Sequence, residues 1–182
     1  MERRINLNAS FRAEEKDGKK IITAYFSVFN ETYEISPYMS EEIDAHAFDN
    51  EINSDIRALL NHDTTIVLGR TTAGTLKLSI DEHGLFGIIE INEEDQDALN
   101  AYARVKRGDI NQCSFGFDIL DEESKTLTNG KTHYIIKSVK LYEVSIVTFP
   151  AYEGTIATAR SKRAQKALEE FKKRLKERIK NA

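Results

Sequence analysis

Short runs of β-branched and aromatic residues recur through the chain and are separated by turn residues. The run from Lys20 to Asn30, KIITAYFSVFN, is typical of a β-strand. Turns are expected at Ala73-Gly74 and between Asp81 and Gly84, where the turn-forming residues cluster. This alternation predicts strands at 20–30, 65–70, 75–80, 85–91 and 111–120.

A hairpin is expected further along the chain. Asn129-Gly130 forms a turn signal at the tip of a polar segment rich in Glu, Ser, Lys and Asn. The following run, THYIIKSVKLYEVSIVTFPAY at 132–152, is compatible with two strands or with one long bent strand. The pattern leaves both arrangements open.

Two segments of this part of the chain carry helix signals. Between Glu93 and Ile110 the apolar residues recur at spacings of three and four, and Gly108 is placed to end a helix. A second, short helix is predicted to start at Ser40, because a serine followed by two glutamates is typical of a helix N-terminus. The apolar positions of the first helix are Ala98, Leu99, Tyr102, Ala103 and Val105.

The C-terminal 23 residues, 160–182, differ from the rest in both charge and periodicity. They carry ten Lys/Arg and three Glu, a net charge of +7, whereas residues 1–159 carry 16 basic and 27 acidic side chains, net −11. One apolar stripe predicts a basic amphipathic helix of roughly 30 Å. The stripe consists of Ala164, Leu168, Phe171, Leu175 and Ile179.

These elements predict a mainly β, α+β protein: an antiparallel barrel or sandwich with flanking helices, followed by the basic helix. Two parts are expected, a body at 1–159 and the helix at 160–182. With 182 residues, 40% of them apolar and 31% charged, the chain is long enough for a packed core.

Composition narrows the possible settings and partners. The overall charge of −4 gives no general signal for nucleic acid, and no segment has the length of an apolar membrane span. The first residues, MERRINLNAS, do not resemble a secretory signal. A single cysteine, Cys113, excludes an intrachain disulfide and indicates a reducing, cytosolic setting.

The segment QCSFGF, 112–117, places a hydroxyl inside an otherwise apolar run. Side chains alternate between the two faces of a strand, so Cys113, Phe115 and Phe117 share the apolar face. Ser114 then lies on the opposite, more polar face beside Gly116, where the absent side chain leaves room for a substrate backbone.

The same alternation applied to KLYEVSIVTF puts Glu143 on the less aromatic face of a second strand. His62 follows an apolar run in LLNHD. A hydroxyl, an imidazole and a carboxylate suit acyl-transfer chemistry, in which the imidazole removes the hydroxyl proton and the carboxylate orients the ring. Most chains of this size contain these three residue types, so spacing alone is weak support.

Four motifs in order strengthen the case: LLNHD…LGR, GTLKLSIDEHGLFGIIEI, VKRGDINQCSFGFDI and LYEVSIVTFPAY. Together they resemble the prohead maturation proteases of tailed phages and prophages, over about residues 20–155. That family is distantly similar to the herpesvirus assemblins, which are β-barrel serine proteases. The resemblance therefore implies an assemblin-like antiparallel β-barrel.

The resemblance also implies the site and the activity. Its histidine and serine motifs map onto His62 and Ser114 as the catalytic pair, with Glu143 as the third member. It implies a serine endopeptidase that cleaves a scaffold protein, or the scaffolding segment of the major capsid protein, and then itself. The setting would be the assembling prohead in the host cytoplasm, and a homodimer is compatible with the assemblin analogy.

Other polar residues are expected to be structural. His46 and His83 are predicted at the surface, His133 within a strand, and Cys113 as a buried, inert thiol. Gly69-Arg70 is either an oxyanion-stabilising element or a strand-end turn. The acidic cluster at 93–97 is explained by the helix N-terminus that follows it, and neither a metal nor a cofactor is expected.

Alternatives remain for the tail and for the whole chain. The basic helix is expected to pack on its own body, to mediate oligomerisation or to grip an acidic partner. Nucleic-acid binding is less favoured, because no aromatic residues alternate with the basic ones. The main competing function is an inactive capsid-assembly or scaffold protein with a protease-like fold, and a third is a β-rich module that contacts nucleic acid.

Overall fold

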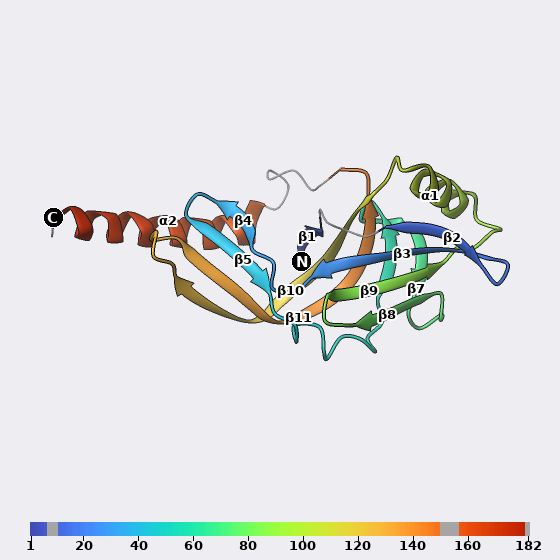
Figure 1. The fold of residues 1–182 in the computed structure, drawn as a ribbon, viewed down its shortest axis with the longest axis horizontal. Coiled ribbons are helices and arrows are strands. Elements are labelled where there is room, and N and C mark those ends of the chain that lie inside the picture. Colours follow the sequence, from blue (N-terminus) through green and yellow to red (C-terminus); the bar gives the residue numbers. More distant parts are fainter. Residues whose placement is uncertain (7–10, 150–156, 181–182) are drawn as a thin grey trace.

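The computed structural model describes residues 1–6, 11–149 and 157–180, and in this part the chain forms two β-sheets and two α-helices (Figure 1). The first sheet has the order β1-β10-β11-β5-β4, and β6 joins β11 to β7. Its strands are β1 (Glu2–Asn6), β4 (Tyr33–Ser36), β5 (Met39–Ile43), β6 (Arg57–Leu60), β7 (Asp63–Arg70), β10 (Gln112–Thr126) and β11 (Thr132–Val147).

The second sheet is smaller and antiparallel, with the order β2-β3-β9-β8. Its strands are β2 (Arg12–Lys16), β3 (Lys19–Val28), β8 (Leu76–Ile80) and β9 (Gly84–Glu90). The buried core combines Phe26 and Ile89 of this sheet with Phe115 and Ile146 of the first, so the main core lies between the two sheets. The strands predicted at 20–30, 65–70, 75–80 and 85–91 are confirmed within a few residues.

The long β10–β11 hairpin organises the first sheet (Figure 1). Its turn contains Gly130, with a φ of 84°, as the Asn129-Gly130 signal predicted. Residues 132–147 form one strand, so the long-strand alternative is correct. The two halves of β11 hold different neighbours on the edge away from β10: β5 pairs with 132–136 and β6 with 143–146, both in parallel.

Helix α1 (Gln96–Arg107) is confirmed with its predicted ends. The Asp95 carboxylate accepts hydrogen bonds from the backbone N–H groups of Asp97 and Ala98, which caps the N-terminus. Gly108 has a φ of 89°, a left-handed conformation that glycine adopts at low cost, and it closes the C-terminus. Asp95 therefore acts as the cap that the acidic cluster was expected to provide.

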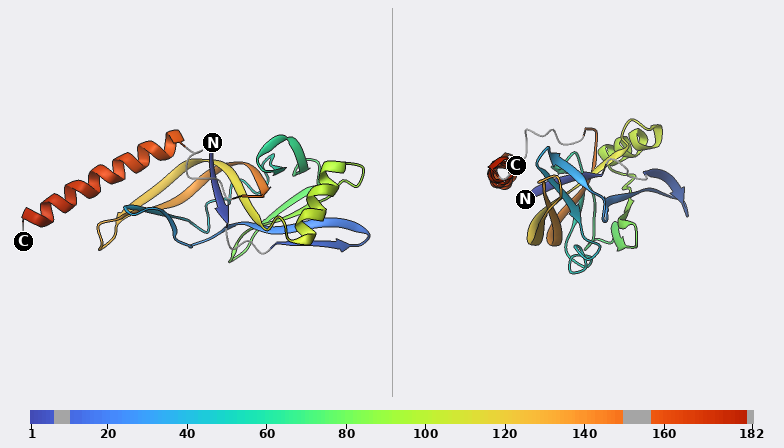
Figure 2. Two further views of the ribbon diagram at one scale, coloured as in Figure 1. Left: turned by 90° about the horizontal axis from the view of Figure 1, so that it is seen from above. Right: turned by 60° about the vertical axis from the view of Figure 1, so that its left-hand side comes forward.

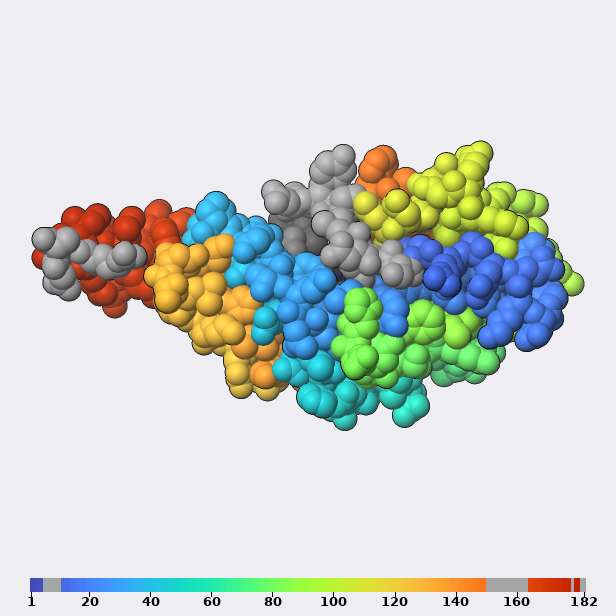
Figure 3. All heavy atoms as spheres, viewed as in Figure 1, coloured from blue at the N-terminus to red at the C-terminus, as the bar shows by residue number. Residues whose placement is uncertain are grey.

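Helix α2 (Ala157–Lys180) confirms the predicted C-terminal helix and begins three residues earlier than expected. Its near half packs on the body, where Ala167 is buried with Met39 and Tyr134. Its far half continues beyond the hairpin tip, as Figures 1 and 2 show, and stands clear of the body in Figure 3. Leu175 and Ile179 of the apolar stripe are 47% and 69% exposed there.

Two fold expectations need correction or stay open. The short helix predicted from Ser40 is wrong: Ser40 to Glu42 lie in strand β5, because parallel pairing with β11 at His133 to Ile135 outweighs the local helix signal. The mainly β, α+β class is confirmed, but the described strands form two sheets without a closed barrel, so the assemblin-like barrel stays a prediction. No helix in the described ranges is long and apolar enough to span a membrane.

Strand β1 is held against β10 by a buried ion cluster. The Arg4 guanidinium donates hydrogen bonds to the carboxylates of Glu41 on β5 and Glu2 on β1, and lies over the Phe117 ring. Arg4 is 5% exposed and Glu41 2%. Burial lowers the pKa of Arg4, but the two carboxylates outweigh it and the pKa is raised. The cluster ties the N-terminal strand to the far side of the hairpin.

We predict that Arg4→Ala lowers the free energy of unfolding by about 3 kcal/mol, because it leaves Glu41 as a buried charge without its main cation. The matched control is Arg107→Ala, since Arg107 pairs with Asp109 at the surface, 77% exposed, and its loss should change stability by less than about 0.5 kcal/mol. Urea unfolding of both variants measures the difference. Equal effects would contradict the assigned role of the cluster.

Candidate active site

His62 lies in the two-residue turn that joins β6 to β7. Leu60 and Asp63 close this turn as paired residues, and Asn61 and His62 both have positive φ values, 53° and 61°. Such a turn matches the twist of the strands but usually contains glycine, because a left-handed conformation costs other residues roughly 1–2 kcal/mol. The cost indicates that the surrounding contacts impose this conformation.

Asn61 supplies those contacts. Its N–H donates to the Ile146 carbonyl, at 2.9 Å, and its side-chain oxygen accepts from the Thr148 N–H, at 2.8 Å. Both partners belong to the end of β11 or follow it directly. The turn is therefore anchored to β11, and the His62 side chain, 8% exposed, is held over that strand.

The register of three neighbouring strands places the other candidates. Ser114 on β10 is opposite Ser145 on β11, and Gly116 is opposite Glu143. On the other edge of β11, β6 places Leu59 beside Ser145. Residues directly opposite in a ladder share a face, so Ser114, Glu143 and Ser145 lie on the same side of the sheet. Ser114 is separated from β6 by two strand spacings of about 4.8 Å each.

The structure brings His62 and Glu143 into direct contact although 81 positions separate them in the sequence. His62 Nδ1 is 2.6 Å from Glu143 Oε1. The Ser145 hydroxyl donates to the other carboxylate oxygen, Oε2, at 2.5 Å. Because a carboxylate only accepts, the Nδ1 of His62 carries the hydrogen and the Nε2 of the neutral ring is left as an acceptor.

Ser114 Oγ and His62 Nε2 are both buried and have no hydrogen-bond partner within the described residues. Ser114 itself is 0% exposed. Buried polar atoms are normally paired, so two orphaned atoms of complementary type in one region are an exception that calls for a function. The described contacts join His62 to Glu143, while no hydrogen bond joins Ser114 to His62.

The space above Gly116 is used differently from the sequence expectation. A Cβ at Gly116 would collide with Glu143 Oε1 and would lie 3.1 Å from the Met1 sulfur. The missing side chain thus makes room for the Glu143 carboxylate and the Met1 side chain, not for a substrate backbone. Consequently, both faces of β10 are buried around Ser114, and the polar-face expectation is wrong with respect to exposure.

A second serine–histidine–carboxylate group was missed from the sequence. His133 Nδ1 is 2.9 Å from Ser40 Oγ, and His133 Nε2 is 3.1 Å from a Glu42 oxygen. Ser40 is 0% and His133 3% exposed. Here the serine oxygen is already engaged by the nitrogen nearer the main chain, so the group links β5 to β11 as a structural contact. No sequence signal could reveal it, since it depends on the parallel pairing of these two strands.

The remaining candidates have structural roles in the described part of the chain. Arg70 donates two hydrogen bonds to Asp55, which lowers the pKa of that carboxyl, and Gly69 packs against the Thr75 carbonyl. These contacts favour the turn interpretation of Gly69-Arg70. Cys113 is buried as predicted, and His46 is exposed as predicted but lies in a turn.

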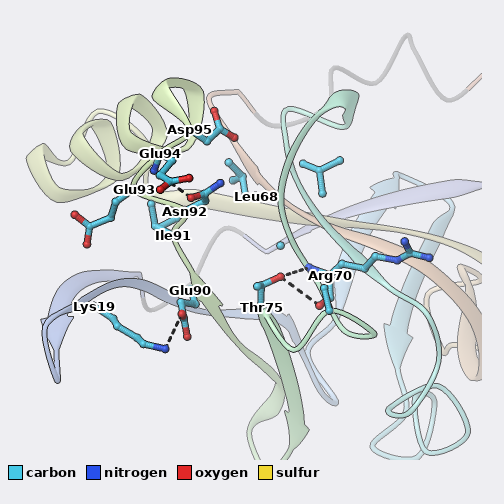
Figure 4. A pocket seen from close by; sticks show the side chains of 13 residues that line it. Lys19, Leu68, Arg70, Thr75, Glu90, Ile91, Asn92, Glu93, Glu94 and Asp95 are labelled. Carbon is cyan, nitrogen blue, oxygen red and sulfur yellow. Dashed lines mark hydrogen bonds and ion pairs between the residues drawn. The ribbon is translucent and has the colours of Figure 1, made fainter.

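A cavity of about 630 Å³ lies elsewhere, between β7 and the segment joining β9 to α1 (Figure 4). Leu68, Arg70, Ile91 and Asp95 are among its lining residues, and none of His62, Ser114 and Glu143 lines it. The acidic cluster at 93–97 borders this cavity. Across the described residues, no group of three or more His, Cys, Asp or Glu is arranged to hold a metal ion.

Comparison with known proteins identifies a family. The sequence profile of the caudovirus prohead serine proteases matches residues 8–171. The prohead protease of Escherichia phage T5 is 33% identical over 97 residues, which cover 53% of this chain and 42% of that protein. The chain thus matches less than half the length of this relative. No solved structure matches.

We predict that Gly116→Ala destabilises the protein by about 1–3 kcal/mol, because the added methyl group displaces the Glu143 carboxylate in a packed interior. The low-field proton resonance of the His62 Nδ1–H should also be lost or shifted. The control Ser124→Ala, at the exposed end of the same strand, should change neither property. Thermal unfolding and proton NMR provide the two measurements, and an unaltered resonance in Gly116→Ala would count against this geometry.

Proposed function

The chain belongs to the caudovirus prohead serine protease family, and on that premise we propose that it is a serine endopeptidase of phage capsid maturation. Ser114 is the nucleophile, His62 the general base and Glu143 the group that orients the histidine. The observation that carries this proposal is the 2.6 Å contact between His62 and Glu143, on the sheet face that also holds Ser114.

In the proposed reaction, Ser114 Oγ attacks the scissile carbonyl carbon while His62 Nε2 takes the hydroxyl proton. The imidazolium that forms is stabilised by Glu143, which already contacts Nδ1. His62 then gives the proton to the departing amine, and an acyl-enzyme remains on Ser114. Water, activated by the same histidine, attacks the acyl carbon and releases the acid product, which restores the Ser114 hydroxyl.

Access to the nucleophile requires a local opening. Ser114 is fully buried, whereas a peptide carbonyl must approach its Oγ to within about 3 Å. The described conformation is therefore a closed one, in which the His62–Glu143 pair is already assembled and Ser114 is covered. A protease that acts inside a closed shell benefits from such restraint, since premature cleavage would remove the scaffold.

The proposed substrates are those of the family's role: a scaffold protein or the scaffolding segment of the major capsid protein, and the protease itself. The proposed setting is the assembling prohead in the host cell. We retain the division into a protease body at 1–159 and a basic helix at 160–182. The exposed far half of α2 leaves its apolar and basic side chains available for a partner.

A second candidate function is an inactive capsid-assembly protein with the same fold. The burial of Ser114 and the lack of a hydrogen bond between Ser114 and His62 favour this alternative. The assembled His62–Glu143 pair favours the enzyme, because a buried carboxylate and a strained histidine turn are costly to keep without a use.

We predict that the wild-type chain, co-expressed with the major capsid protein of its own phage or prophage, cleaves that protein. Ser114→Ala and His62→Asn should reduce cleavage by about 10⁴-fold or more, because each removes a group that takes part in every turnover. Glu143→Gln should lose roughly 10²–10⁴-fold, since the ring loses its orienting charge. Intact-mass spectrometry of the capsid protein and of the chain measures both cleavage and self-trimming.

The matched controls are His46→Asn, an exposed histidine, and Ser124→Ala, an exposed serine, both of which should cleave at the wild-type rate. Cleavage by Ser114→Ala at the wild-type rate would refute the assignment of the nucleophile. If wild type and all variants are equally inactive while correctly folded, the assembly-protein alternative is supported instead.

A further inference from the structure

Ser145 is a second buried serine beside the proposed nucleophile. It is directly opposite Ser114 in the β10–β11 ladder and is 0% exposed. Unlike Ser114, its hydroxyl is engaged: Oγ donates to Glu143 Oε2 at 2.5 Å. The two serines therefore occupy the same face of the sheet in different hydrogen-bonding states, one with a partner and one without in the described structure.

The Glu143 carboxylate is held from two sides. Oε1 contacts His62 Nδ1 at 2.6 Å, and Oε2 accepts from Ser145. Ser145 is two positions after Glu143 on the same strand, so both side chains leave the same face of β11. A glutamate has three side-chain torsions, the last of which is broad, and the Gly116 backbone beneath it offers no side chain to restrain it.

We infer that Ser145 is a positioning residue for the proposed catalytic group. Its hydroxyl fixes the rotation of the Glu143 carboxylate so that Oε1 faces His62, and it supplies a hydrogen bond that a carboxylate 4% exposed needs. This inference rests on the proposed function. It also assigns different roles to the two serines, because the Ser145 hydroxyl is committed to Glu143 and is not free to attack a carbonyl.

The test measures serine reactivity with a fluorophosphonate probe, which requires no knowledge of the cleavage site. Ser114 Oγ attacks phosphorus, fluoride leaves, and the hydroxyl proton passes to His62 Nε2. Ser145→Ala should lower the labelling rate at saturating probe by about 10–100-fold, the effect expected when a hydrogen bond to a charged group is lost. The probe concentration that gives half this rate should stay within twofold, since Ser145 does not contact the probe.

Two further variants separate positioning from other roles. Ser145→Cys keeps a weaker donor of similar shape, so its rate should lie between those of wild type and Ser145→Ala. In a Glu143→Ala background, Ser145→Ala should change the rate by less than twofold, because the hydroxyl then has no carboxylate to hold. This double-mutant cycle also shows that labelling reports the chemical step, provided that Glu143→Ala alone slows it.

Each result bears on one claim. Wild-type labelling by Ser145→Ala, with none in Ser114→Ala, would overturn the role of Ser145 and leave the proposed function intact. A full loss in Ser145→Ala that persists in the Glu143→Ala background, in folded protein with unchanged thermal unfolding, would also overturn it. Unreduced labelling of Ser114→Ala, with the probe mapped to another residue by mass spectrometry, would refute the proposed function itself.

Discussion

The pairing of β11 with strands on both of its edges is the constraint on which the candidate site depends. β10 brings Ser114 to one edge, and β6 brings the His62 turn to the other, so residues 114, 143 and 62 meet across three strands. A slip of one residue in either ladder would move Glu143 or Ser114 to the opposite face. The hydrogen bonds of Asn61 to Ile146 and Thr148 hold β6 in this register.

Polar groups in this protein are concentrated in a region that is otherwise core. Glu143, Ser145 and Ser114 are nearly or fully buried between apolar neighbours such as Val144 and Phe115. Glu143 is compensated by two hydrogen bonds, whereas Ser114 Oγ and His62 Nε2 are not compensated in the described residues. Uncompensated burial and a left-handed histidine both lower stability, and such costs are found where they serve a reaction.

The same sheet carries a second buried network with a different role. Arg4, Glu41 and Glu2 tie β1 to β5, and His133 joins Ser40 near the hairpin tip. In these groups each buried charge or hydroxyl has a partner, as expected of contacts that fix strand order. Comparing the two networks distinguishes the candidate site: it alone combines an oriented histidine with an unengaged hydroxyl on the same face.

Local patterns were sufficient for most elements, because alternation and caps act within a few residues: the strands, the α1 limits at Asp95 and Gly108, and the α2 helix follow from them. The Ser40 segment failed because its strand is formed by a partner 93 positions away. The candidate residues were named through motifs, but their contacts, the burial of Ser114 and the role of Ser145 arise from ladder register, which no local pattern encodes.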